Sequence, residues 1–122
     1  MVMKRGPIGR FILRWFISAL GIWIAAGLLG GRVDYSSLAA IIISGLFLAV
    51  ANTIIKPIVV ILSLPAILFS LGLFMIVING LMVIIVAKVY SGLQITNFGT
   101  AMVAGMIIGL VNYLVTTILE DR

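Results

Sequence analysis

The sequence of 122 residues contains no histidine and no cysteine, and only three of its residues are acidic. Without cysteine the chain forms no disulfide and offers no thiolate ligand to a metal. Nucleophilic catalysis needs a side chain paired with a base, and a metal site needs several ligands. Both kinds of residue are scarce here, so the sequence predicts a protein that is not an enzyme and that uses no metal or cofactor.

Charge is scarce as well, and this scarcity indicates the environment of the chain. Hydrophobic residues make up 64% of the sequence and the mean hydropathy is +1.40, whereas roughly half of the residues of an average globular domain are apolar. The sequence therefore predicts a single integral membrane domain over residues 1–122. Between Phe11 and Leu119 the charged residues are Arg14, Arg32, Asp34, Lys56 and Lys88.

Four apolar stretches are long enough to be membrane spans, which need about 20 mostly apolar residues. The predicted spans are residues 11–29, 37–55, 71–89 and 99–119. A short segment rich in turn-forming residues joins the first span to the second, and another joins the third to the fourth. We therefore predict an all-α membrane protein whose four transmembrane helices form two helical hairpins.

The connection between the second and third spans, residues 56–70, has a different character. It is apolar apart from Lys56 and two serines, and it contains Pro57 and Pro65. Such a segment is too short to cross a bilayer and is typical of an interfacial or re-entrant connection. Proline lacks an N–H group and disfavours helix in the preceding residue, so Pro57 is expected to end or kink the second span. Alternatively, both helices run long and meet at a tight turn near residues 63–65.

The positive charges predict how the chain is oriented in the membrane. Lys and Arg gather in the cytoplasmic loops of membrane proteins, and six of the eight basic residues lie on the cytoplasmic side if both termini do. Both termini are therefore predicted to lie in the cytoplasm. The basic arm at Lys4, Arg5, Arg10 and Arg14 is expected to bind anionic lipid headgroups. Membrane lipids are therefore predicted partners, and nucleic acid is not.

An internal repeat is visible at an offset of 60 residues. Residues 45–52 (GLFLAVAN) realign on residues 105–112 (GMIIGLVN), so that small residues and an asparagine recur in register. A unit of two helices predicts a parallel duplication about an axis along the membrane normal. The alternative is a chance match between two apolar segments.

In each copy of this segment, small residues and an asparagine share one helix face, at positions i, i+4 and i+7. Small residues let helix backbones approach closely in lipid. These faces are predicted to pack the second span on the fourth, with each asparagine hydrogen-bonded across the contact, and a contact between subunits is the alternative. The residues are Gly45, Ala49 and Asn52 in the first copy, and Gly105, Gly109 and Asn112 in the second.

Two further polar residues lie within or beside the predicted spans. An unpaired amide is costly in hydrocarbon, so Asn79 should face protein or water, in an interhelical hydrogen bond or in the lining of a pore or substrate path. Lys56 lies at the end of the second span, where a lysine commonly extends its amine to the headgroups. If the following segment is re-entrant, the amine lies instead at the mouth of a central cavity and favours anions or lipid phosphates.

The centre of the sequence carries a series of motifs: NTIIKP at 52–57, LSLP at 62–65, LGLF at 71–74 and NG at 79–80. With this series the chain resembles, over nearly its whole length, the phage holin family of small four-spanning bacterial membrane proteins, the mycobacterial-type four-helix phage holins. The resemblance implies a four-helix fold in the bacterial inner membrane and carries over no lysis activity. It marks candidate structural or functional positions at Asn52, Lys56, Pro57, Pro65, Gly72, Asn79 and Asn112.

Two functional hypotheses follow from these patterns. The first is a small homo-oligomeric membrane protein, holin-like in fold, which acts by assembly or by forming a permeation path and not by catalysis. The second is an accessory, scaffold or lipid-binding subunit of a bacterial membrane complex, with another membrane protein as its partner. A membrane enzyme would need a nucleophile paired with a base, and the candidates Lys56 and Lys88 lie on opposite sides of the membrane in the predicted topology.

Overall fold

The computed structural model describes residues 6–120, and most of them are helical. Three helical segments are long and apolar enough to cross a membrane: Pro7–Arg32, Leu38–Leu62 and Phe98–Leu119. A shorter apolar helix covers Phe74–Val89. The helical architecture agrees with the predicted fold class.

The elements follow one another along the chain with short connections. They are α1 (Pro7–Leu29), the 3₁₀ turn η1 (Gly30–Arg32), β1 (Val33–Tyr35), α2 (Leu38–Val50), the π-helical turn η2 (Ala51–Ile55), α3 (Lys56–Leu62), α4 (Leu64–Phe69), α5 (Phe74–Val89), β2 (Leu93–Ile95) and α6 (Phe98–Glu120).

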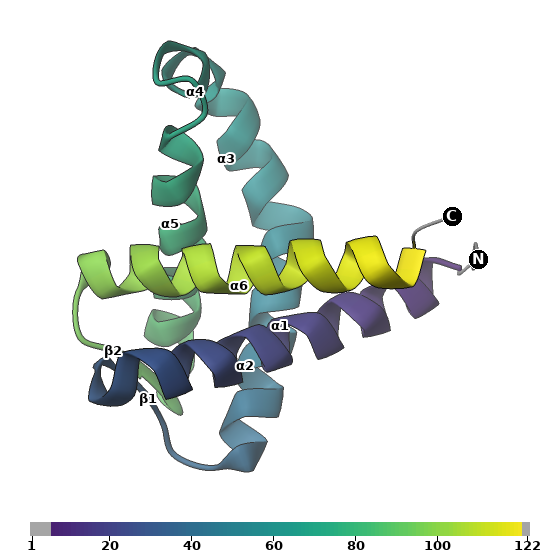
Figure 1. Cartoon of the computed structure of the whole chain (residues 1–122), viewed down its shortest axis with the longest axis vertical. Helices are drawn as coiled ribbons and strands as arrows, with labels where there is room; N and C mark the ends of the chain where they lie inside the picture. The colour runs from purple at the N-terminus through teal and green to yellow at the C-terminus, as the bar shows by residue number, and fades with distance from the viewer. Residues whose placement is uncertain (1–5, 121–122) are drawn as a thin grey trace.

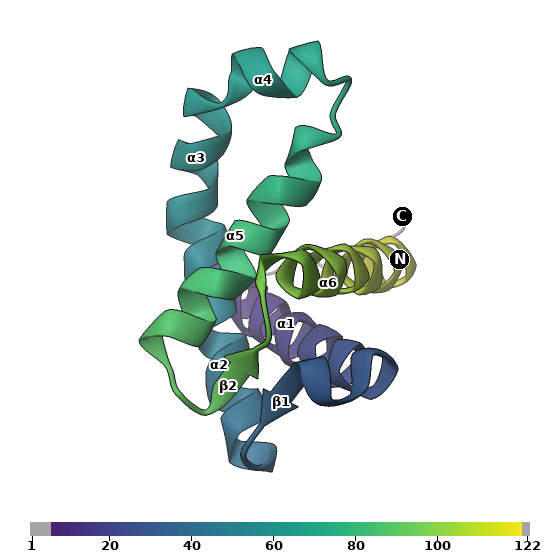
Figure 2. The ribbon, with the colours of Figure 1, turned by 90° about the vertical axis from the view of Figure 1, so that its left-hand side faces the viewer.

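These elements form two helical hairpins that pack against each other. The first hairpin consists of α1 and the helix made by α2, η2 and α3, and the second consists of α5 and α6. Helix α1 packs against α2 and α6, and α6 also packs against α5. Figure 1 shows α1 and α6 running side by side across α2 and α5, with the start of α1 and the end of α6 far from β1 and β2. Helix α4 joins the tips of α3 and α5, which project from the body as an arm (Figure 2).

The connections inside the two hairpins pair with each other. Strands β1 and β2 form an antiparallel ribbon, which is flanked by two further backbone bonds. The N–H of Ser36 donates to the carbonyl of Gly92 (3.1 Å), and the N–H of Thr96 donates to the carbonyl of Arg32 (3.0 Å). The donors Ser36 and Thr96 lie 60 positions apart, and so do the acceptors Arg32 and Gly92. The two bonds are therefore equivalent, and a local two-fold axis relates the two strands of the ribbon.

The helices that follow the two strands begin with the same kind of cap. The Ser37 hydroxyl accepts a hydrogen bond from the N–H of Ala40 (3.2 Å) at the start of α2. The Asn97 side-chain oxygen accepts one from the N–H of Thr100 (2.8 Å) at the start of α6. Serine and asparagine both satisfy an orphan N–H of the first helical turn. The two caps again lie 60 positions apart in the sequence.

The small-residue faces pack within each hairpin. A Cβ atom on Gly45 in α2 would lie 2.7 Å from the Cβ of Ala19 in α1. A Cβ atom on Gly105 in α6 would lie 2.9 Å from the backbone carbonyl carbon of Asn79 in α5. The prediction that these faces pack the second span on the fourth is therefore wrong. The short connection brings the helices of one hairpin together first, and their backbones approach most closely where glycine leaves room.

The second long helix continues past Pro57, which was expected to end or kink it, so this helix runs long as in the alternative considered. Helix α2 passes through η2 into α3, which ends at Leu62, and the N–H of Lys56 bonds to the carbonyl of Ala51 in a π-helical turn. Proline in an α-helix removes one hydrogen bond and clashes with a carbonyl of the preceding turn. The wider π turn just before Pro57 relieves this conflict, so the helix survives the proline.

The connection between the hairpins consists of α4 and the turn that follows it. Pro65 lies in the first turn of α4, where a missing N–H removes no helical hydrogen bond. Gly72 has φ +91°, in the left-handed region that glycine adopts without steric cost. The motif positions Pro65 and Gly72 therefore shape this connection, and α5 begins only at Phe74.

Candidate functional site

A polar cavity of about 670 Å³ lies between the two hairpins. All four long helical segments contribute to its wall. Its polar lining consists of Arg10, Arg14, Ser18, Asn52, Lys56, Asn79, Asn112 and Thr116. Its apolar lining includes Leu13, Ile17, Leu48, Met82, Val83 and Ile108.

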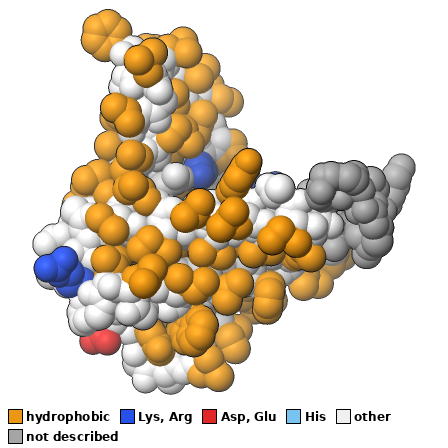
Figure 3. All heavy atoms as spheres, viewed as in Figure 1, with side chains coloured by type: hydrophobic (Ala, Val, Ile, Leu, Met, Phe, Trp, Pro, Cys, Tyr) orange, Lys and Arg blue, Asp and Glu red, His pale blue; other side chains and the backbone are white. Residues whose placement is uncertain are grey.

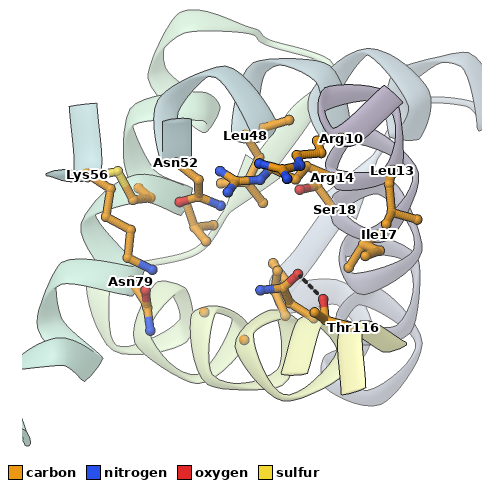
Figure 4. A pocket seen from close by; sticks show the side chains of 17 residues that line it. Arg10, Leu13, Arg14, Ile17, Ser18, Leu48, Asn52, Lys56, Asn79 and Thr116 are labelled. Carbon is orange, nitrogen blue, oxygen red and sulfur yellow. Dashed lines mark hydrogen bonds between the residues drawn. The ribbon is translucent and has the colours of Figure 1, made fainter. Parts of the chain in front are cut away.

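Three basic side chains give this cavity its charge. Arg10 and Arg14 lie one turn apart on α1 and extend toward Asn52 on the facing helix, and Lys56 and Asn79 also line the cavity (Figure 4). Both arginines are exposed, whereas Lys56 is half-buried. None of the lining residues that the structure describes carries a carboxylate. The cavity is therefore positively charged and favours an anion.

The first hairpin places Asn52 and Lys56 at an irregular point of its second helix. Asn52 lies in the π turn and Lys56 follows it directly. The Thr53 hydroxyl donates to the carbonyl of Ala49 (2.7 Å), which also lines the cavity. Single π-helical turns are frequent at functional sites because they interrupt the regular positions of side chains.

The second hairpin contributes neutral polar groups to the same cavity. On α6 the Thr116 hydroxyl donates to the side-chain oxygen of Asn112 (3.5 Å), as the dashed line in Figure 4 shows. This bond leaves the amide nitrogen of Asn112 able to donate to a ligand. Asn79 packs on Gly105, and a Cβ atom on Gly109 would lie 3.8 Å from its amide nitrogen. Gly105 therefore allows the close approach of Asn79, whereas a methyl group at position 109 would only be in ordinary contact with it.

The cavity is closed toward the strands. Beyond the cavity lining, the buried side chains toward β1 and β2 are mostly apolar, with Ser44 and Thr100 as buried polar residues among them. Within residues 6–120 this one chain thus forms a blind cavity that does not continue through the core. The core between cavity and strands includes Ile22, Ala25, Ala26, Val33, Val86, Leu93, Ala101 and Ala104.

The structure brings most of the sequence-predicted positions together around this cavity and leaves the others elsewhere. Lys56 is among the residues that line the cavity. Asn112 bonds to Thr116 in its own helix, not across a helix contact as predicted. The predicted positions that line the cavity are Ala49, Asn52, Lys56, Asn79, Gly105, Gly109 and Asn112. Gly45, Pro57, Pro65 and Gly72 lie outside its lining.

Sequence reasoning missed four polar residues of the cavity: Arg10, Arg14, Ser18 and Thr116. The first two were expected at the headgroups as part of the basic arm. Their spacing gave a usable signal, because Arg10, Arg14 and Ser18 lie at i, i+4 and i+8 and thus on one helix face. Thr116 occupies the position 60 residues after Lys56, so the repeat also pointed to it.

Apolar side chains cover much of the outer surface, including the arm formed by α3, α4 and the start of α5 (Figure 3). Together with the long apolar helices, this surface defines a multi-pass membrane protein. The chain belongs to the family described as mycobacterial 4 TMS phage holin, superfamily IV, which matches residues 9–114. The resemblance drawn from the sequence motifs is thereby confirmed.

Two relatives cover most of the chain. The uncharacterised membrane protein YvlD of Bacillus subtilis is 33% identical over 108 residues, which are 85% of this chain and 91% of YvlD. The uncharacterised protein SCO3922 of Streptomyces coelicolor is 30% identical over 109 residues, which are 84% of this chain and 86% of SCO3922. No solved structure gives a significant match to the chain.

Proposed function

We propose that this protein is a non-catalytic membrane protein that binds an anionic lipid by its headgroup in the cavity between the hairpins. The observation that carries the proposal is the grouping of Arg10, Arg14 and Lys56 around one cavity. Like charges that share a cavity repel each other, and an anion between them replaces repulsion with attraction. Arginine and lysine are the usual partners of phosphate, which they bind through charge-assisted hydrogen bonds.

The size and surroundings of the cavity favour a lipid over a small free anion. Its volume of about 670 Å³ lies within the roughly 300–1,000 Å³ of typical ligand pockets, whereas an inorganic phosphate would leave most of it empty. Ile54 and Ile58, on the same long helix as Lys56, are more than half exposed. This helix therefore presents apolar surface to acyl chains outside the cavity.

Native mass spectrometry of the full chain in detergent tests this proposal. Lipids with identical acyl chains and either an anionic or a zwitterionic headgroup are added in increasing amounts. We expect one anionic lipid to bind at least tenfold more tightly than phosphatidylcholine, because the cavity holds three cations. Lys56→Met should weaken that binding about tenfold or more, since hydrogen bonds to charged groups contribute about 1.5–3 kcal/mol.

Lys88→Met is the matched control, because it removes the same charge from an exposed position outside the cavity. It should leave the affinity unchanged. Equal binding of anionic and zwitterionic lipids, or equal effects of the two substitutions, would disprove lipid binding in the cavity.

A permeation path formed by several copies of the chain is the second candidate function. It is favoured by the polar residues that both hairpins contribute at one place, Asn79 and Asn112 among them. Because the apolar core closes the cavity toward the strands, a path would need either an opening of this core or an assembly of chains. The same assembly could present its surface to another membrane protein.

Flux from liposomes that contain the purified chain tests this second candidate. Release of ions and then of larger dyes, altered by Lys56→Ala and Asn79→Leu, would support a path through the cavity. If liposomes that contain correctly inserted protein release neither ions nor dyes, the permeation path is excluded and lipid binding stays as the proposed function.

The proposed location is the bacterial cytoplasmic membrane, with both termini in the cytoplasm. The cavity is lined by residues near the start of α1 and the end of α6, so it would open toward the cytoplasmic leaflet. Because the chain contains no cysteine, single cysteines at residues 34 and 94 can report their side of the membrane through labelling in intact cells. We expect a membrane-impermeant thiol reagent added outside the cells to label both cysteines. Protection of both would mean that the orientation is opposite to the proposed one.

The proposed internal duplication accounts for where the cavity lies. The strand pairing, the two caps and the glycine contacts of the hairpins all recur after 60 residues. Two similar hairpins that pack about a local two-fold axis leave a space on that axis. Asn52 and Asn112, also 60 positions apart, both face it.

A further inference from the structure

The first hairpin supplies all the charged side chains of the described lining, together with the neutral Ser18 and Asn52, whereas the second supplies only neutral polar groups. Arg10, Arg14 and Lys56, the three basic residues of the cavity, belong to the first hairpin. The second hairpin contributes Asn79 from α5 and, from α6, Asn112 together with Thr116. A ligand that fits this cavity is therefore anionic on one side and neutral but polar on the other.

Asn79, Asn112 and Thr116 of the second hairpin form the neutral wall of the cavity. Their side chains can form hydrogen bonds with hydroxyl groups. A side-chain amide offers both donors and an acceptor, and a threonine hydroxyl can do both. A ligand hydroxyl also donates and accepts, so it can satisfy either kind of group. The bond from Thr116 to the oxygen of Asn112 leaves the Asn112 amide nitrogen to donate to such a hydroxyl.

We infer that the ligand's headgroup is a polyol linked through phosphate, with the phosphate against the first hairpin and the hydroxyls against the second. This inference rests on the proposed binding of an anionic lipid. The simplest lipid of this class is phosphatidylglycerol, and headgroups that carry a sugar belong to the same class. The inference adds a choice among anionic lipids that positive charge alone does not make.

Headgroups with an amine fit the cavity poorly. An ammonium group would lie near three cations, and none of the described lining residues offers a carboxylate to pair with it. Like charges close together in a partly buried site repel strongly because the effective dielectric is low. Phosphatidylethanolamine and phosphatidylcholine should therefore bind weakly.

The test compares phosphatidylglycerol with phosphatidic acid of the same acyl chains, using the full chain in native mass spectrometry. Phosphatidic acid carries at least as much charge on its phosphate but no polyol. If charge alone decides, phosphatidic acid binds as well or better. We expect phosphatidylglycerol to bind about three- to tenfold more tightly, because its hydroxyls form hydrogen bonds with the neutral wall.

Substitutions on the second hairpin separate this preference from anion binding. Asn112→Ala and Thr116→Val should each reduce the preference for phosphatidylglycerol about threefold or more and leave the affinity for phosphatidic acid unchanged. Thr117→Val is the matched control, because Thr117 is the neighbour of Thr116 and does not line the cavity. It should change neither affinity.

Soluble probes test whether the ligand is a lipid or a free polyol phosphate. Glycerol 3-phosphate and inorganic phosphate are added as competitors of bound phosphatidylglycerol. We expect displacement only at concentrations at least a hundredfold above those of the lipid, because neither probe has acyl chains. Displacement by glycerol 3-phosphate at equal concentration would overturn the lipid and identify a soluble polyol phosphate as the ligand.

The outcomes distinguish failure of this inference from failure of the proposed function. If both anionic lipids bind equally and Asn112→Ala changes neither, the polyol preference is wrong while anionic lipid binding stands. If neither lipid binds better than phosphatidylcholine, the proposed function itself is wrong.

Discussion

The two hairpins of this protein share their framework and differ in what they bring to the cavity. Each begins its second helix with a side-chain cap, and each brings its two helices together at a glycine, Gly45 or Gly105. In the first hairpin the second helix contains a π turn followed by Lys56. In the second, α6 is an unbroken α-helix with Thr116 at the corresponding position.

This comparison separates the residues that hold the fold from those that define the site. The shared features lie at the helix starts, the strand ribbon and the helix crossings, where backbone geometry allows few alternatives. Lys56 and Thr116, which differ between the hairpins, lie in the wall of the cavity. Two similar hairpins thus form a site that is not symmetric, with positive charge on one wall and neutral polar groups on the other.

Moving the lysine from one hairpin to the other tests whether its position matters. Lys56→Thr should weaken binding of phosphatidylglycerol ten- to hundredfold, since it removes a cation that bonds to the phosphate. Adding Thr116→Lys to Lys56→Thr returns the charge to the cavity from the opposite wall. Binding of phosphatidic acid should recover to within about threefold of the unsubstituted protein.

In this double variant, binding of phosphatidylglycerol should recover less, because the neutral wall has lost Thr116. The measurement is the pair of dissociation constants for each variant, with Lys88→Thr as the control. Full recovery for both lipids would mean that the asymmetry of the hairpins has no role in ligand choice.

Substitutions at Gly45 and Gly105 test whether both hairpins depend on a close approach of their two helices. An alanine Cβ at position 45 would lie 2.7 Å from the Cβ of Ala19, and one at position 105 would lie 2.9 Å from the backbone of Asn79. Gly45→Ala and Gly105→Ala should therefore lower the free energy of unfolding by about 1–3 kcal/mol each. Thermal unfolding of the detergent-solubilised chain measures this.

Gly109→Ala is the matched control for both substitutions. Its Cβ atom would meet only the amide nitrogen of Asn79, at 3.8 Å, and alanine favours helix over glycine. It should be neutral or slightly stabilising. Equal melting temperatures for all three variants would contradict the close approach at the crossings.

One buried position breaks the likeness of the two hairpins without touching the cavity. Ser44 in α2 is fully buried and its hydroxyl has no hydrogen-bond partner within the described part of the chain, whereas Ala104 occupies the corresponding place in α6. A buried unsatisfied hydroxyl is costly, so Ser44→Ala should raise the free energy of unfolding by about 1 kcal/mol. Ala104→Ser should lower it by a similar amount, and a loss of stability in Ser44→Ala would reveal a partner for the hydroxyl.

Hydropathy located the first and last long helices. The stretches predicted as the first and fourth spans, 11–29 and 99–119, lie inside α1 and α6. This works because a membrane-spanning helix must be apolar along its whole length. The family was likewise visible in the order of small residues, asparagines and prolines.

The helix that contains Pro57 was harder to predict, because its continuation depends on a π turn. Such a turn requires one hydrogen bond to skip a residue, and no residue type signals this. The partner of each glycine face also depended on the hairpin geometry. The same face fits any helix with a flat surface, and the chain connection decides which helix lies nearest.

The cavity could be predicted only in pieces. Asn52, Lys56, Asn79 and Asn112 stood out because polar residues are rare in this sequence. Arg10 was predicted to be part of a basic arm at the membrane surface. The sequence does not show that the start of α1 lies beside the cavity between the hairpins. A site assembled from four helices requires their relative positions, which hydropathy does not contain.

Photo-crosslinking is the measurement that tests the central claim most directly. A phosphatidylglycerol analogue with a diazirine on its headgroup is placed in vesicles with the full chain, and the adducts are mapped by peptide mass spectrometry. We predict adducts within residues 52–56 and 112–116, from both walls of the cavity, and their loss in Lys56→Met. Adducts confined to outward-facing residues such as Trp23, unchanged in that variant, would contradict a lipid headgroup in the cavity.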